Sequence, residues 1–384
     1  MGDERCRMGL SLWLLSAGTQ FNRMDESRVE ESQALTAGAQ GGRLYGYVPY
    51  SRDLERPADR RRFPQYAAIR NLPFKIVSGW EDSDVIVLSA AADMTEWVHA
   101  PSNRRIIVDL PDAFLDERRG LRRSFRGLAK WAGGEVSRPV LNYHRALERL
   151  LERADAVVCS TEEQAVRIAR HCPNVHPILD LHVEFECLPP TRRTSDRLDI
   201  VWEGLTATLP AIQPMLPALR ALASQIDVCL HLVTDLQSPR YMNRFFSRQT
   251  ADLVSDWGVE VKLHQWSIDT LIKVASGCEI AIVPVDLTDP MAVGKPENRM
   301  RIFWRLGLPV VASASPANVR AASLAGLSDR VLCSTVEDWR RILESLHARP
   351  EDRLAIAVAG QAAALTAYSG ESLVRRWDRL FETL

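Results

Sequence analysis

Short, almost continuously apolar runs alternate with longer stretches of helical periodicity from residue 43 onward. In the first half, this pattern predicts strands at 44–49, 84–89, 105–110, 156–160 and 176–183. In the second half, it predicts strands at 199–202, 227–234, 259–263, 279–284, 309–312 and 330–333, with a long helix at 240–257. Strands that are apolar on both faces and alternate with helices indicate α/β domains with parallel sheets covered on both sides.

A segment with two adjacent prolines, 187–196, is polar and has no periodicity, which is typical of a linker between domains. We therefore expect two doubly wound domains, 42–188 and 197–367, that face each other across a cleft. Residues 1–41 offer few apolar side chains to bury and are expected to form a flexible extension. The last segment, 368–384, places apolar side chains on one helical stripe and must pack on another part of the chain.

Composition excludes several classes of protein. The 384 residues carry 48 basic and 49 acidic side chains, so no basic surface for nucleic acid is expected. The sequence has no apolar run of about 18 residues, the length needed to span a bilayer. Its seven cysteines are odd in number and form no Cys-x-x-Cys pair. Reduced thiols in a cytoplasmic protein are therefore favoured over a disulfide or zinc framework.

The loop after the fourth strand of the second domain has the features of a phosphate site. Gly294 and Lys295 stand just before an expected helix, and Arg299 follows one turn later. Free backbone N–H groups at a helix start, an ammonium group and a guanidinium fork can together hold phosphate oxygens. The alternative is that both cations are solvated loop residues.

Several motifs in order resemble bacterial GT-B glycosyltransferases of families 1 and 4. In the second domain they are Ile200-Val-Trp-Glu-Gly204, Cys278–Pro284, Lys295-Pro-Glu-Asn-Arg299, Gly307–Ser313 and Pro316-Ala317, which resemble the donor-binding half. In the first domain, 85–89, 107–112 and 154–161 resemble the acceptor half. Each motif is loose by itself, and their order across 45–380 carries the resemblance.

The resemblance implies two Rossmann-like domains and a C-terminal helix that crosses back to the first domain. It also implies transfer of a sugar from a nucleotide diphosphate-sugar to a hydroxyl of a glycan or lipid-linked acceptor, without a metal or other cofactor. Retention of the anomeric configuration is preferred by the same analogy. The donor-binding residues would be Gly204, Thr206, Pro284, Lys295, Asn298 and Arg299.

The sequence also departs from the family pattern. The two carboxylates of the Glu-x7-Glu motif are replaced by Gly294 and Ile302. Asp289 and Glu297 have the same spacing but lie five positions out of register. The loss keeps a second function open, that of a catalytically silent sugar-nucleotide binder or partner subunit. A sugar-nucleotide epimerase is a remoter alternative.

Catalytic candidates in the first domain are carboxylates and a histidine. Asp109 and Asp112 flank Pro111 at the end of a strand, where a carboxylate can accept a hydroxyl proton or cap a helix. His182 lies between Asp180 and Glu184, and alternation would place all three on one face of an extended segment. That face suits acid–base chemistry, and a solvated edge strand would have the same pattern.

Two weaker candidates complete this group. His99 follows a Glu-Trp pair, and Asp82-Ser-Asp84 looks like the metal motif of the other large glycosyltransferase fold. Because Asp82-Ser-Asp84 precedes a strand, it is interpreted as a strand-entry turn, and no metal site is expected.

Basic residues repeat every four positions in a segment that includes an apolar stripe. They are Arg118, Arg122, Arg126 and Lys130. Such a helix can lie on anionic lipid or bind an anionic acceptor, which would place the protein peripherally on the inner face of the membrane. The alternative is a helix with a core-facing stripe and an arginine-rich solvent face.

Overall fold

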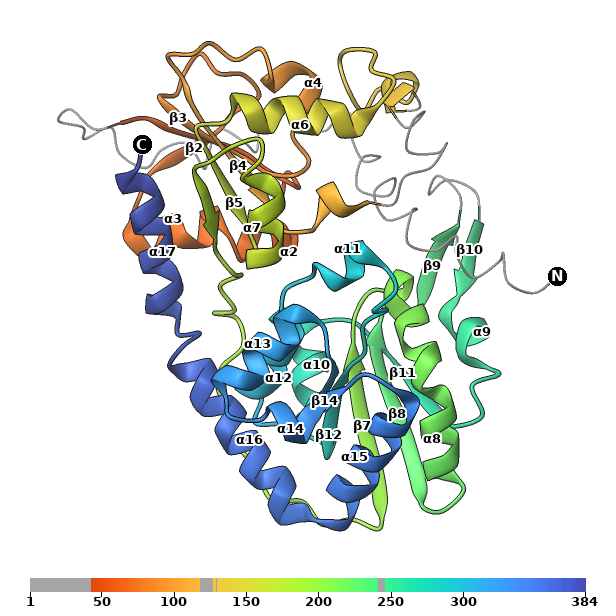
Figure 1. Cartoon of the computed structure of the whole chain (residues 1–384). Coiled ribbons are helices and arrows are strands. Elements are labelled where there is room, and N and C mark those ends of the chain that lie inside the picture. The colour runs from red at the N-terminus through yellow and green to blue at the C-terminus, as the bar shows by residue number, and fades with distance from the viewer. Residues whose placement is uncertain (1–42, 118–126, 129, 241–245) are drawn as a thin grey trace.

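The computed structural model describes residues 43–117, 127–128, 130–240 and 246–384. Figure 1 shows two α/β domains, one above the other, with the C-terminal helices running along both. The first sheet has six parallel strands in the order β2-β1-β3-β4-β5-β6. These are β1 (Tyr45–Val48), β2 (Phe74–Ile76), β3 (Val85–Leu88), β4 (Arg105–Leu110), β5 (Ala156–Cys159) and β6 (Val175–Pro177).

The second sheet also has six parallel strands, in the order β11-β8-β7-β12-β13-β14. They are β7 (Arg197–Glu203), β8 (Asp227–Thr234), β11 (Glu260–Gln265), β12 (Ile280–Val283), β13 (Val310–Ser313) and β14 (Leu332–Cys333). The central strands β3, β5, β12 and β13 are buried at every position. Burial on both faces explains the continuous apolar runs and confirms the expected architecture.

Helices cover both sheets. Those of the first domain are α2 (Pro57–Arg60), α3 (Phe63–Arg70), α4 (Met94–Trp97), η5 (Phe114–Asp116), α6 (Tyr143–Arg153) and α7 (Glu162–Ile168). Those that follow β7 are η6 (Thr206–Met215), α8 (Leu216–Ala223), α10 (Ile268–Ala275), α11 (Pro290–Val293), α12 (Asn298–Arg305), α13 (Pro316–Leu324), α14 (Ser328–Val331), α15 (Val336–Ala348) and α16 (Pro350–Leu365).

Three sequence predictions were wrong in detail. The edge strand β2 was missed, because it is only three residues long and largely exposed. The expected helix at 240–257 is instead an antiparallel hairpin, β9 (Gln237–Arg240) and β10 (Phe246–Gln249), followed by the short helix α9 (Thr250–Val254). The strand expected at 176–183 ends at Pro177, the last residue of β6 that pairs with β5.

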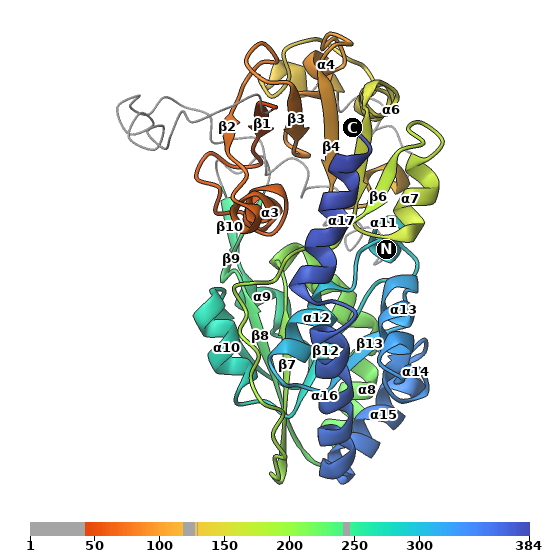
Figure 2. The same ribbon diagram turned by 90° about the vertical axis from the view of Figure 1, so that its left-hand side faces the viewer.

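The last helix, α17 (Gly370–Glu382), crosses from the second domain to the first, as expected (Figure 2). Trp377 and Phe381 stack on Tyr66 of α3, with ring centroids 5.6 and 5.4 Å apart. The Tyr66 hydroxyl donates a hydrogen bond to Asp378 over 3.1 Å, and Arg70 pairs with the same carboxylate. The amphipathic stripe predicted at 368–384 is therefore part of the core of the first domain.

Within the described ranges, no helix combines the length and the apolar character needed to cross a bilayer.

Candidate functional site

The strand order of the second sheet reverses between β7 and β12. In open parallel sheets, ligands bind beyond the carboxyl ends of the strands at such a reversal. The loop after β7 begins at Gly204, and the loop after β12 begins at Pro284, which is buried. The first turn of helix α12 lies beside the segment that follows β7. The Arg299 guanidinium, in its first turn, donates a hydrogen bond to the Thr208 hydroxyl over 3.2 Å.

Gly204 lets Arg299 approach the end of β7. A Cβ at this position would lie 2.6 Å from Arg299 Nη2 and 2.7 Å from the Trp202 ring, so a larger residue would displace the guanidinium. The guanidinium lies over the Trp202 ring, and its Nε is 3.7 Å from a Glu203 oxygen. Burial lowers the pKa of Arg299, and Glu203 only partly opposes that effect. The positive charge of Arg299 is therefore only partly compensated by its neighbours.

Lys295 faces a carboxylate from the other domain. Asp112 follows β4 of the first domain, and burial raises the pKa of its carboxyl group while the Lys295 ammonium opposes the rise. Burial also lowers the pKa of Lys295, against the effect of Asp112. The two domains thus bring a carboxylate and two cations, Lys295 and Arg299, into one electrostatic environment.

A close contact between the domains holds this arrangement. The Gln164 amide, in α7 of the first domain, donates a hydrogen bond to the Gly294 carbonyl over 3.0 Å. A Cβ on Gly294 would lie 2.6 Å from the Ala113 side chain, so glycine permits the approach. Gln164 was not predicted from the sequence, because no motif singles it out. Gly294, which we had noted as part of a phosphate loop, fits the domain interface.

Asp109 is an internal ion-pair partner. Arg62 Nε lies 2.8 Å from both Asp109 carboxylate oxygens, and Nη2 lies 2.5 Å from one of them. The side chains of both residues are almost completely buried. Burial raises the pKa of Asp109, and Arg62 opposes the rise. The carboxylate is held in the interior of the first domain, unlike Asp112 three residues later.

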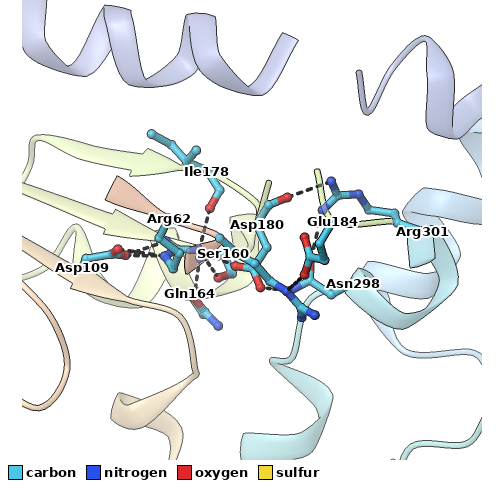
Figure 3. A network of polar contacts seen from close by, with 10 residues as sticks. Arg62, Asp109, Ser160, Gln164, Ile178, Asp180, Glu184, Asn298 and Arg301 are labelled. Carbon is cyan, nitrogen blue, oxygen red and sulfur yellow. Dashed lines mark hydrogen bonds and ion pairs between the residues drawn. The ribbon is translucent and has the colours of Figure 1, made fainter. Parts of the chain in front are cut away.

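The expected common face of Asp180, His182 and Glu184 does not exist, because the strand ends before them. Asp180 accepts hydrogen bonds from Arg62 and from the Asn298 amide, each over 2.9 Å (Figure 3). Glu184 pairs with Arg61, and His182 is buried. Asn298, expected at the donor phosphates, therefore connects the two domains.

Thr206 is also engaged in the fold. Its hydroxyl donates a hydrogen bond to the Asp235 carbonyl over 2.9 Å and is buried. Of the donor candidates, Lys295 and Arg299 carry the charge beyond the carboxyl ends of the second sheet, and Gly204 permits the position of Arg299.

The Asp289 and Glu297 carboxylates, which have the family spacing, take structural roles. Asp289 caps α11, and Glu297 accepts a hydrogen bond from the Tyr368 hydroxyl over 2.9 Å and pairs with Arg320. Ile302, at the position of one family carboxylate, is 3% exposed in the core. The structure thus offers no carboxylate at that position.

The weaker candidates lie elsewhere. Asp84 accepts a hydrogen bond from the Leu44 backbone N–H at the entry of β1 and β3, and His99 is exposed in a turn after α4. In the part of the chain that the structure describes, one cluster has metal-ligand chemistry, Asp199 with Cys229 and His231. Arg197 already pairs with Asp199 over 3.1 Å there.

Arg118, Arg122 and Arg126 of the basic segment lie outside the described residues. Lys130 pairs with Glu135 over 2.9 Å, and its ammonium lies 4.8 Å from the centroid of the Tyr143 ring. This cation is therefore engaged within the first domain.

No protein-family model matches the sequence, and no curated protein matches it. Solved structures do match. HepE from Anabaena in complex with UDP-glucose has a TM-score of 0.60 at 11% identity, over 89% of this chain and 100% of HepE. Sucrose-phosphate synthase from Thermosynechococcus elongatus has a TM-score of 0.56 at 13% identity, over 78% of this chain and 73% of the synthase.

TarM from S. aureus, in a complex that contains UDP, has a TM-score of 0.53 at 11% identity. The match covers 82% of this chain and 58% of TarM, so this chain corresponds to little more than half of that protein. At such identities the likeness is one of architecture. The two facing parallel domains and the returning last helix accordingly give this chain the GT-B fold, which these glycosyltransferases share.

Proposed function

We propose that the protein transfers a sugar from a nucleotide diphosphate-sugar to a hydroxyl group of a glycan or lipid-linked acceptor. The observation that carries this proposal is the approach of the first-domain loop after β4 to Gly294, beside the Arg299 guanidinium at the end of β7. This approach brings the charge of Asp112 near those of Lys295 and Arg299. The positions of the two cations, at the strand reversal of the second sheet, support their role in binding a diphosphate. The complexes of HepE with UDP-glucose and of TarM with UDP support a nucleotide-linked donor.

In this proposal, the bond between the anomeric carbon and the donor phosphate breaks as the acceptor oxygen bonds to that carbon. Lys295 and Arg299 stabilise the negative charge that develops on the departing nucleotide diphosphate. The reaction scheme uses these two cations in the role that a metal ion has in other enzymes. Domain contact through Gly294 and Gln164 limits the entry of water, and so limits hydrolysis of the donor.

Asp112 would act on the acceptor. It either takes the proton of the attacking hydroxyl or holds that hydroxyl by a hydrogen bond. The first role goes with inversion of the anomeric configuration. In the second, which is compatible with the retention that the family resemblance favours, the hydroxyl proton passes to an oxygen of the departing diphosphate. NMR of the anomeric proton in the first-formed product distinguishes the two stereochemical outcomes.

A donor screen is the direct test. Thermal unfolding of the full chain is measured with UDP-, GDP-, CMP- and ADP-sugars, and the donor that stabilises the protein is then tested for release of free nucleotide. Stabilisation followed by slow release, faster with an acceptor, is expected of a transferase. Failure of every donor to stabilise the protein would contradict the proposal.

Lys295→Ala tests the donor site itself. A charged contact to phosphate is worth about 1.5–3 kcal/mol, so loss of the ammonium should weaken donor affinity at least about tenfold. Arg192→Ala, in the exposed linker, is the matched control and should leave the affinity unchanged. Equal affinities for the two variants, measured by calorimetry, would remove Lys295 from the site.

A catalytically silent sugar-nucleotide binder or partner subunit is the second candidate. It is favoured by Gly294 and Ile302, which replace both family carboxylates. Such a protein would bind a donor but release no nucleotide from it. An epimerase, the remoter alternative, would interconvert the free donor sugar without any acceptor.

The membrane association predicted from Arg118, Arg122 and Arg126 extends the proposal to an acceptor at an anionic surface. Each such arginine contributes about 1 kcal/mol near the surface, and salt screens the attraction. Flotation with anionic liposomes should therefore decrease in high salt and in a variant with all three residues changed to Glu. Unchanged flotation of that variant would contradict the extension.

A further inference from the structure

A cavity of about 100 Å³ lies where the two connections between the domains pass α12. His182 and Val183, from the segment after β6, line one side of this hinge cavity, and Arg301 and Arg305 of α12 line another. Tyr368, at the junction of α16 and α17, lines a third. On the same measure, one water needs only about 10–15 Å³, so the hinge cavity has room for a small polyatomic ion.

His182 lines the hinge cavity, and both of its ring nitrogens are buried. The residue is 4% exposed, and neither nitrogen makes a hydrogen bond of ordinary geometry to any residue that the structure describes, although the Asn298 side chain lies near enough to favour the charged form of the ring. The edge of the ring packs against Phe185 at a centroid distance of 6.2 Å. Buried polar groups in proteins nearly always have a partner, so this imidazole indicates a ligand or ordered solvent in the cavity.

Arg301 is the second buried group with unused hydrogen-bonding capacity. The residue is 3% exposed, and its terminal nitrogens donate to the Asn298 side chain over 3.0 Å and to the Asp180 carbonyl over 2.9 Å (Figure 3). Its Nε has no partner in the described part of the chain. The Arg305 Nε donates to the Phe185 carbonyl over 2.7 Å.

The charges of the two arginines that line the cavity are only partly compensated. Among the described residues, no carboxylate forms an ion pair with Arg301 or Arg305, and the nearby Glu297 and Asp180 are bonded to Arg320 and Arg62. Burial lowers the pKa of Arg301 to about 10, and burial with the neighbouring cations Arg301, Arg61 and Arg305 holds the pKa of His182 well below its usual value. A negative ion in the hinge cavity would relieve both effects.

We propose that the hinge cavity binds a small tetrahedral oxyanion of the phosphate class, held by Arg301, Arg305 and His182. The two guanidinium groups come from successive turns of α12 and the imidazole from the segment after β6, so the ion would be held from two sides. Guanidinium groups are well suited to phosphate oxygens. The bound ion would tie the segment after β6 to α12 and so stabilise the present arrangement of the domains.

Thermal unfolding of the full chain with inorganic phosphate tests the proposal. Phosphate at about ten times its Kd should raise Tm by about 2–4 °C over sodium chloride of equal ionic strength. Arg305→Gln should abolish this difference. Arg375→Gln, which changes an exposed arginine of α17, is the matched control and should retain it. An equal effect of chloride on the wild-type chain would overturn the proposal.

The diphosphate site in the cleft could also bind phosphate, and Lys295→Ala separates the two sites. The Tm shift should persist in Lys295→Ala if phosphate occupies the hinge cavity. If the Tm shift caused by phosphate is lost in Lys295→Ala and persists in Arg305→Gln, the ion binds at the proposed diphosphate site, and the proposal is overturned. Because this inference does not use sugar transfer, its failure would leave the proposed function standing.

A spectroscopic measurement decides the matter even if Arg305→Gln does not fold. The His182 imidazole resonances of the wild-type chain, assigned with His182→Phe, report the pKa of the ring. Phosphate should raise this pKa by at least about one unit, since a nearby negative charge favours the imidazolium form. An unchanged His182 titration in saturating phosphate would overturn the proposal.

Discussion

The two domains use buried charge in different ways. In the first, Arg62 lies within 3 Å of oxygens of both Asp109 and Asp180, so opposite charges compensate each other inside the protein. In the second, Arg299 has its nearest carboxylate oxygen, on Glu203, at 3.7 Å, and burial lowers its pKa. Charge that is compensated internally stabilises a fold, whereas incompletely compensated charge can stabilise a ligand.

This difference separates structural from functional candidates of the same residue type. Asp109 and Asp112 are three positions apart, and both are carboxylates with raised pKa values. Asp109 has its guanidinium within its own domain, whereas burial raises the pKa of Asp112 and the charge that most opposes the rise is that of Lys295 in the other domain. The two carboxylates therefore differ in that the opposing cation belongs to the same domain for Asp109 and to the other domain for Asp112.

The largest effect is expected for Asp112→Asn. Loss of a group that accepts or positions the acceptor hydroxyl should reduce turnover by about 10²–10⁴-fold, while donor affinity stays within a few-fold. Asp116→Asn, on the same loop, is the matched control, since Asp116 pairs with Arg167. Steady-state kinetics with the identified donor provide the measurement, and turnover that survives Asp112→Asn would break the distinction between the two carboxylates.

Arg62→Ala tests the internally compensated charge of the first domain. It leaves two buried carboxylates without their common partner, which should destabilise the protein by about 3–5 kcal/mol in urea unfolding. Arg105→Ala removes a half-exposed pair with Asp155 and should cost about 0–1 kcal/mol. Similar losses in the two variants would show that the buried network has no special role in stability.

The pH dependence of turnover tests the charge shared across the cleft. Burial raises the pKa of Asp112. Because turnover is expected to need the ionised carboxylate, it should begin to fall, as the pH is lowered, at a higher pH than for an ordinary aspartate. Lys295 opposes this rise, and Lys295→Met should therefore move the acid limb to higher pH by about one unit. Arg192→Ala should leave the limb in place. A shift of the limb to lower pH in Lys295→Met would contradict the assigned contact.

Much of the fold was predictable because both sheets are buried on both faces. Strands such as Val85–Leu88 and Ile280–Val283 consist of apolar β-branched residues and leucine or alanine, which alternation with helices identifies as parallel. The hairpin of β9 and β10 was not predictable in this way, because its residues at 237–240 and 246–249 are mostly polar. The pattern of apolar residues also could not show where the pairing of β6 with β5 ends.

The candidate site was predictable only in part. Lys295 and Arg299 follow from their place before a helix, and Asp112 from its place after a strand. Sequence did not show that Asn298 would turn to Asp180, or that Gln164 would reach Gly294, because these contacts join residues more than 100 positions apart. Such contacts depend on the relative placement of two domains, which no local spacing encodes.

The return of α17 to the first domain reverses the usual order of folding during synthesis. Domains generally fold in the order in which they leave the ribosome, N-terminal first. Here Trp377 and Phe381 complete the aromatic core around Phe63 and Tyr66, so this core is complete only after α17 has left the ribosome. The nascent chain must therefore carry an unfinished apolar surface on its first domain while the whole second domain is synthesised.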